Sequence, residues 1–226
     1  MARFQVQSLK DLLIIINHFD KYPLISQKLA DFLLFKKALG IIQRKEHLTI
    51  DGLRKIVSIK ASMNLGLTSD LEKAFPKIIP VERPLVVEKI VPDPNWLAGF
   101  ASGEGCFYVK INSYSYGTGI KVVLMFKLGQ HARDEKLMRS LIEYFDCGRL
   151  YKDKEVFEYR VAKFSDIENK VIPFFKKYII LGVKSKDFTD FCKVCDIMKE
   201  KKHLTTKGLN QIRTLKAGMN IKRKFD

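Results

Sequence analysis

The sequence has few cysteines and no long apolar run, and each shortage excludes a class of protein. Its 226 residues include four cysteines, too few and too scattered for the disulfide framework of a small secreted domain, so a reducing compartment is expected. The longest apolar patch, Leu12–Ile16, is far too short to span a bilayer. We therefore expect a folded protein without membrane contact.

Acidic residues are also in short supply, and this shortage predicts the kind of partner. The chain has 25 Asp and Glu residues against 41 Lys and Arg residues, which gives a formal net charge of +16 and a pI near 9.6. A positive charge of this size spread over a folded chain indicates a polyanion as the partner.

The chain contains an internal repeat. Residues 19–64 align with residues 175–220 at a constant offset of 156, and 20 of the 46 positions are identical without a gap. The identical pairs include Lys28 and Lys184, Asp31 and Asp187, His47 and His203, and Asn64 and Asn220. The sequence is therefore two copies of one structural unit.

The two copies differ in extent. Residues 95–226 are expected to form a complete second unit, and residues 65–94, with their several prolines, an extended linker. Residues 1–64 match only the C-terminal part of that unit, namely one strand followed by helices. The counterpart of Trp96 would fall before residue 1, so we expect a truncated first unit.

Alternation of apolar and polar residues predicts an α+β fold for the second unit, with an antiparallel sheet that carries helices on one face. The expected strands are 106–112, 120–130, 148–151 and 156–161, and the expected helices are 96–103, 134–145 and most of the chain from there to 220. The same alternation predicts which side chains face away from the core. These are Tyr108, Lys110, Asn112, Lys121, Lys127, Arg149, Tyr151, Glu158 and Arg160, with Arg3, Gln5 and Gln7 on the strand of the first unit.

Such a face is suited to duplex DNA. Arg and Lys donate to guanine in the major groove, and Asn and Gln pair with adenine. The alternative is an ordinary solvated sheet face, for which mixed charge is also expected.

The segment Trp96–Phe107 holds the most informative pattern. Gly99 and Gly103 are four residues apart, with Ala98 and Ser102 beside them, and small residues at this spacing let two helix backbones approach closely. The helix ends in a single carboxylate, Glu104, and the chain continues directly into a strand.

This segment resembles the motif of the LAGLIDADG homing endonucleases, and the chain is most similar to their fungal mitochondrial, intron-encoded, single-chain branch. The resemblance implies two pseudo-symmetric units, a saddle-shaped antiparallel sheet with helices on its outer face, and motif helices packed at the unit interface. It implies that Glu104, with Gly103 beside it, binds Mg²⁺. It also implies catalytic roles for Gln130, Lys184 and the repeat partner Lys28, although a strand-end Gln or a helix-start Lys is more often simply solvated.

The function expected from the resemblance is site-specific, metal-dependent hydrolysis of double-stranded DNA in the mitochondrion. Because the motif occurs once, we expect impaired or no cleavage by this chain alone, and association through the unpaired motif helix is a further expectation. The alternatives are a non-catalytic nucleic-acid-binding remnant and a maturase that binds intron RNA.

Overall fold

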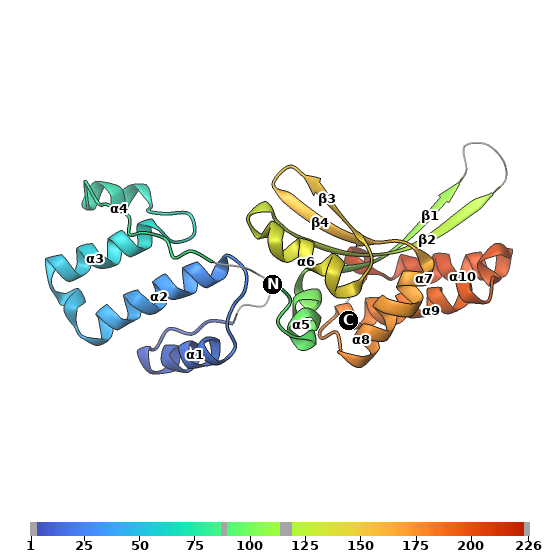
Figure 1. The fold of residues 1–226 in the computed structure, drawn as a ribbon, viewed down its shortest axis with the longest axis horizontal. Coiled ribbons are helices and arrows are strands. Elements are labelled where there is room, and N and C mark those ends of the chain that lie inside the picture. The colour runs from blue at the N-terminus through green and yellow to red at the C-terminus, as the bar shows by residue number, and fades with distance from the viewer. Residues whose placement is uncertain (1–3, 87–89, 114–118, 224–226) are drawn as a thin grey trace. The chain divides into compact units, whose positions relative to one another are not determined.

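The computed structural model describes residues 4–86, 90–113 and 119–223, and the chain divides into two compact units, residues 1–88 and 89–226 (Figure 1). The second unit carries the sheet, and the described part of the first is helical. Within the described ranges, no helix has both the length and the apolar composition needed to cross a membrane.

The first unit contains four α-helices in its described part, and the first three pack around two small apolar clusters. The helices are α1 (Leu9–Lys21), α2 (Lys28–Gln43), α3 (Ile50–Ala61) and α4 (Ser69–Ala74). One cluster, around Ile16 and Phe32, joins α1 to α2. The other, around Ile41 and Ile59, joins α2 to α3.

The strand expected near Arg3 is a wrong prediction for the residues described. Residues 4–7 have no regular secondary structure, and Gln5 and Gln7 are exposed. A strand is stabilised by a hydrogen-bonded neighbour, and the described part of this unit contains no other strand. Arg3 itself lies outside the described residues.

The linker expected over residues 65–94 also differs from the prediction. Thr68 caps the N-terminus of α4 through its side chain, so a helical turn forms inside the segment. Further along, Val81 packs on the cluster between α2 and α3, and Arg83 forms a 2.7 Å ion pair with Asp31. Most of the segment therefore belongs to the first unit.

The second unit confirms the α+β fold class. Its sheet is antiparallel with strand order β1-β2-β4-β3. The strands are β1 (Gly105–Ser113), β2 (Ile120–His131), β3 (Arg149–Asp153) and β4 (Val156–Val161), and the helices are α5 (Pro94–Glu104), α6 (Glu135–Phe145), α7 (Phe164–Asp166), α8 (Ile172–Lys177), α9 (Lys184–Lys199) and α10 (Thr206–Ala217).

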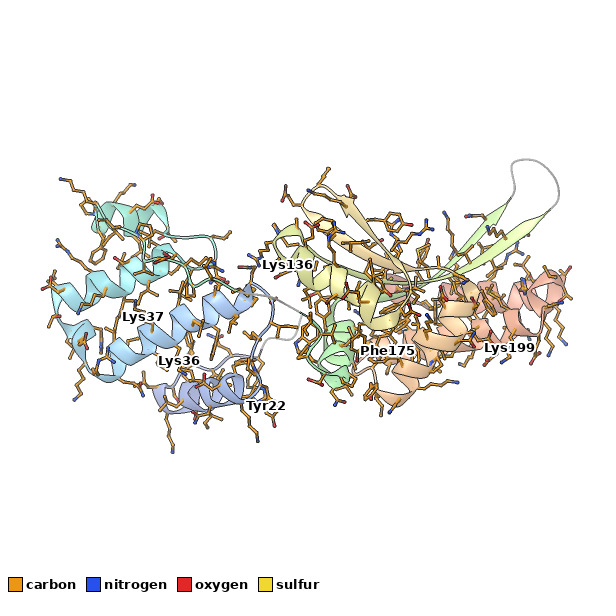
Figure 2. The ribbon with its side chains drawn as sticks, viewed as in Figure 1. Tyr22, Lys36, Lys37, Lys136, Phe175 and Lys199 are labelled. Atoms are coloured by element: carbon orange, nitrogen blue, oxygen red, sulfur yellow. The ribbon has the colours of Figure 1, made fainter. Side chains whose placement is uncertain are left out.

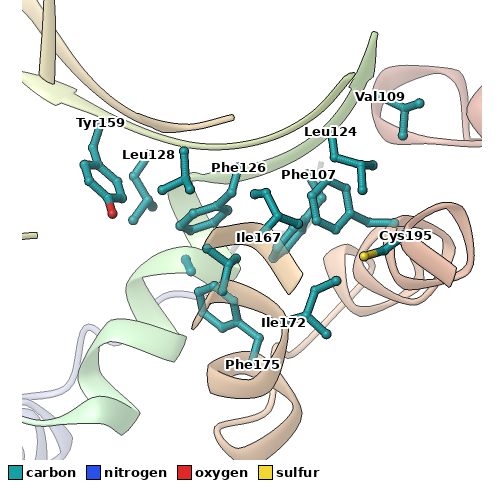
Figure 3. Packing of buried hydrophobic residues seen from close by; sticks show 14 of the residues in the cluster. Phe107, Val109, Leu124, Phe126, Leu128, Tyr159, Ile167, Ile172, Phe175 and Cys195 are labelled. Carbon is teal, nitrogen blue, oxygen red and sulfur yellow. The ribbon is translucent and has the colours of Figure 1, made fainter. Parts of the chain in front are cut away.

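One face of this sheet is buried under the helices. Every second residue of β2 from Val122 to Leu128 lies in the core, with Phe107 of β1 and Tyr159 of β4 (Figure 3). Phe107 and Phe126 stack with their ring centroids 5.2 Å apart, and Phe175 of α8 packs edge-on against both. Because side chains alternate along a strand, the remaining residues face away from the helices.

The repeat read from the sequence is visible as matched structure. Helices α2 and α9 each have 16 residues, and α3 and α10 each have 12. In both units a buried aspartate lies at the start of the longer helix and accepts a 3.1 Å hydrogen bond from a backbone N–H that follows the shorter helix. Asp31 accepts from Asn64 in the first unit, and Asp187 accepts from Asn220 in the second. The same sequence features therefore produce the same helical hairpin twice.

Candidate active site and nucleic-acid interface

The motif helix α5 is defined at both ends by local chemistry. At its start, the Asp93 carboxylate accepts the backbone N–H groups of Asn95 and Trp96 at 2.8 and 3.0 Å, and Pro94 follows as the first helical residue. At its end, a Cβ on Gly105 would lie 2.5 Å from the Ala101 carbonyl oxygen, so only glycine lets the chain turn into β1. The turn leaves Glu104 exposed at the C-terminal end of the helix.

This end of α5 attracts cations. The C-terminus of a helix carries partial negative charge from its unpaired carbonyl groups, and Glu104 adds a full negative charge there. Lys184, the first residue of α9, places its positive charge at this helix end. Its Nζ donates a 2.6 Å hydrogen bond to the carbonyl oxygen of Gly103. The structure thus brings Lys184 and the motif residues Gly103 and Glu104 together.

The environment of Lys184 is unusual for a lysine. Partial burial lowers the pKa of its ammonium group, and the nearby Cys106, Glu104 and Asp187 act in the opposite direction. The segment leading to Lys184 is tied to the motif helix, because Ser102 Oγ accepts the Leu181 N–H at 2.9 Å. This positioning role of Ser102 was not predicted, since small size alone explained a serine on that helix.

The four small residues of the motif helix do not share one environment. Ala98 is buried, and Ser102 is half-buried and donates to the Ala98 carbonyl oxygen at 2.7 Å. Gly99 and Gly103 are exposed, and a Cβ built on either would meet no atom of the described residues within 4 Å. Because they have no side chains, the two glycines leave a strip of the α5 backbone exposed.

Gln130 lies close to this helix end through the strand register. Leu128 pairs with Gly105, the first residue of β1, and Gln130 lies two residues further along the core-facing side of β2, where it is half-buried. Its Oε1 accepts the backbone N–H of His131 at 3.0 Å. Lys28 starts α2 in the first unit, as Lys184 starts α9 in the second. The catalytic roles of both residues stay predictions.

Glu104 has the chemistry of a partial metal site. Its carboxylate and the Gly103 carbonyl are hard oxygen donors of the kind that Mg²⁺ prefers. Within the described residues, no three His, Cys, Asp or Glu side chains gather closely enough to hold a metal ion. Glu104 therefore fits the common arrangement in which one or two carboxylates bind Mg²⁺ and phosphate oxygens and water complete its coordination.

The register places the nine second-unit residues predicted to face outward on one face of the sheet. Tyr108 pairs with Met125, Lys127 with Arg160, and Asn112 with Lys121, all on the side away from the helices. Arg149 and Tyr151 of β3 lie opposite Arg160 and Glu158 of β4 on the same side. We call this surface the open face; its members are Tyr108, Lys110, Asn112, Lys121, Lys127, Arg149, Tyr151, Glu158 and Arg160.

Part of the open face is hollowed. A depression of about 430 Å³ lies where β3 and β4 meet the loop after β4. Its lining adds residues that alternation alone did not single out as a site: Met125, Gly148, Val161, Ala162, Lys163 and Asp166. Lys163 lies two residues after the end of β4 and could have been noticed as one more cation next to the predicted face.

Comparisons with known proteins agree with this geometry. The family model described as LAGLIDADG endonuclease matches residues 1–39 and 97–195. The chain therefore belongs to the LAGLIDADG endonuclease family. It is 41% identical over 218 residues to a protein of Neurospora crassa described as "Probable intron-encoded endonuclease 3", and 40% identical over 215 residues to that organism's "Probable intron-encoded endonuclease 2".

Solved structures show the same fold. The homing endonuclease I-SmaMI bound to cleaved DNA superposes with a TM-score of 0.94 at 49% identity, covering 97% of this chain and 74% of that one. I-GzeII in complex with its DNA target gives 0.92 at 46% identity, covering 97% and 76%. I-SmaMI has also been solved on an uncleaved DNA target in the presence of calcium ions. The chain spans 41% and 46% of the lengths of the two Neurospora relatives.

Proposed function

We propose that this protein is a site-specific endonuclease that binds double-stranded DNA on the open face and cuts it at Glu104 with the help of Mg²⁺. The observation that carries the proposal is the helix end where an exposed carboxylate, a carbonyl and the Lys184 ammonium converge, in the unit that also holds the basic open face. The DNA-bound relatives support the choice of duplex DNA as the ligand.

Each group of residues has a distinct task in this proposal. The cations of the open face bind the DNA and position its backbone. Glu104 would hold the metal ion, and the ion would supply Lewis-acid stabilisation of the phosphate and lower the pKa of a water molecule. Lys184 places a positive charge beside the phosphate on which negative charge develops, and Gln130 orients water through its amide.

We further propose that cutting both strands requires a second carboxylate from another motif helix, in the same or in a second polypeptide. Gly99 and Gly103 offer the strip of backbone on which such a helix would pack. Two copies of the 226-residue chain joined there would place two Glu104 side chains about a two-fold axis, and their DNA target would be a palindrome.

The relatives' intron origin supports action in the mitochondrion of a fungus. Binding to the host intron RNA is the competing function for the same basic surface, and the experiment below includes RNA for that reason.

A selection from random sequence tests the proposal. The purified 226-residue chain is incubated with a randomised 30-base-pair duplex library in Ca²⁺, and bound duplexes are sequenced; a structured RNA pool runs in parallel. We expect a DNA consensus, and little or no double-strand cleavage by the monomer when Mg²⁺ replaces Ca²⁺. Recovery of RNA without any DNA consensus would contradict the endonuclease assignment.

A further inference from the structure

The open face carries three cations in a line. Lys127 on β2 lies directly opposite Arg160 on β4, and Arg160 lies directly opposite Arg149 on β3. We call these three residues the cation row. Like charges directly opposite one another destabilise a sheet, so the row stores electrostatic repulsion in the absence of an anionic partner.

One acidic side chain lies within the cation row. The Oε1 atom of Glu158 accepts a hydrogen bond from Nε of Arg160 and forms an ion pair with Nζ of Lys127 at 3.4 Å. Lys127, Glu158 and Arg160 have 25%, 27% and 37% of their side-chain surface exposed. Because water reaches them only partly, these ion pairs are screened less than pairs on a fully exposed surface.

Two tyrosines complete the arrangement. Lys127 Nζ lies 5.5 Å from the ring centre of Tyr108, and the Arg160 guanidinium lies 4.5 Å from the ring centre of Tyr151, both within cation–π range. Glu158 therefore contacts two cations, and each cation also contacts an aromatic ring. Long flexible side chains held in this way lose less entropy when a ligand binds.

Arg160 has hydrogen-bond donors that remain available to a ligand. Arg160 uses Nε for Glu158, and among the described residues its two terminal NH₂ groups form no hydrogen bond. A pair of N–H donors from arginine matches O6 and N7 of guanine in the major groove, and a glutamate oxygen accepts from N4 of cytosine. Arg160 and Glu158 thus present donors and an acceptor side by side, the pattern complementary to one G·C base pair.

We propose that Glu158 is a positioning residue that orients Lys127 and Arg160 and makes the second unit specific for a G·C pair at one position of its target. This inference rests on the proposed binding of duplex DNA to the open face. Glu158 also costs general affinity, because it cancels one of the positive charges that attract phosphate. Glu158 therefore raises the selectivity for a G·C pair and lowers the overall affinity for DNA.

The test compares Glu158→Gln with a variant of equal charge change elsewhere. Glu143→Gln is the matched control, because Glu143 is exposed on α6, which packs on the opposite face of the sheet. The randomised-duplex selection is run on the wild type and both variants. We expect Glu158→Gln to bind non-specific duplex about threefold more tightly and to lose roughly tenfold of its preference for G·C at one consensus position. Glu143→Gln should keep the wild-type consensus.

Arg160→Lys is a second test variant, and it leaves the total charge unchanged. It removes the paired donors and should abolish the guanine preference at the same position while non-specific binding stays within about twofold. Circular dichroism verifies that each variant is folded. An unchanged consensus in both Glu158→Gln and Arg160→Lys would overturn the inference while leaving the endonuclease proposal intact, whereas a wild type that selects no DNA would refute the endonuclease proposal itself.

Discussion

If the open face binds the DNA backbone, then removing one of its cations should change the salt dependence of binding by a calculable amount. The face carries five basic residues, Lys110, Lys121, Lys127, Arg149 and Arg160, and one acidic residue, Glu158, so its net charge is 5 − 1 = +4. Log K falls with log[salt] by about 0.9 per phosphate neutralised. Four neutralised phosphates correspond to a slope near −3.6, or a loss of roughly 150-fold between about 50 and 200 mM salt.

Lys110→Gln is the informative perturbation, since Lys110 is exposed in the middle of β1 on the open face. The slope should become shallower by about 0.9, which reduces the loss over the same salt range to roughly 40-fold. The matched control is Lys136→Gln on α6, which packs on the other face of the sheet (Figure 2). Fluorescence anisotropy with a labelled duplex measures both slopes. Equal slopes for the two variants would refute the assignment of the binding surface.

Two further predictions concern stability. Gly148→Ala should destabilise the second unit by about 3 kcal/mol, because Gly148 has φ of +83° and a Cβ there would lie 2.5 Å from the buried Tyr159 ring. Gly182→Ala shares the positive φ but meets no described atom within 4 Å, so it should cost only about 1 kcal/mol in the same thermal melts; equal losses would contradict the steric explanation. In the first unit, burial acts to raise the pKa of Asp31, but hydrogen bonds from Arg83 and the Asn64 backbone outweigh it and lower the pKa. The stability from this carboxylate is therefore present above its unfolded pKa of about 3.9 and is lost as the pH falls through the lower folded value. Arg83→Gln should make acid unfolding of this unit less steep, and an unchanged acid profile would show that Asp31 does not contribute.

The elements that sequence predicted correctly depend on local patterns. Alternation identified the four strands of the second unit and the side of each strand that faces the core, because the period of two is a property of the strand itself. The internal repeat, with its offset of 156 residues, predicted that Lys28 and Lys184 are equivalent, and both begin a 16-residue helix.

The features that the sequence did not predict depend on contacts with residues far away in the chain. The expected strand near Arg3 had the right alternation, but the described part of the first unit contains no other strand. The expected linker was predicted from its prolines, which gave no sign that Arg83 would pair with the buried Asp31. Alternation also placed Lys127, Glu158 and Arg160 on one face without showing that they touch, since contact depends on the β2–β4 register.

We propose that Glu104 holds a divalent metal ion against the backbone of DNA bound on the open face. Affinity cleavage tests it most directly: Fe²⁺ replaces Mg²⁺, and ascorbate with peroxide generates short-lived hydroxyl radicals that cut DNA next to the iron. With the 226-residue chain on its selected duplex, we expect cuts confined to a few adjacent nucleotides. Glu104→Gln should abolish these cuts while the dissociation constant for the duplex stays within about threefold, since the amide keeps the shape of the side chain and loses the charge that binds the metal. Localised cuts of equal strength with Glu104→Gln would show that Glu104 does not hold the metal ion.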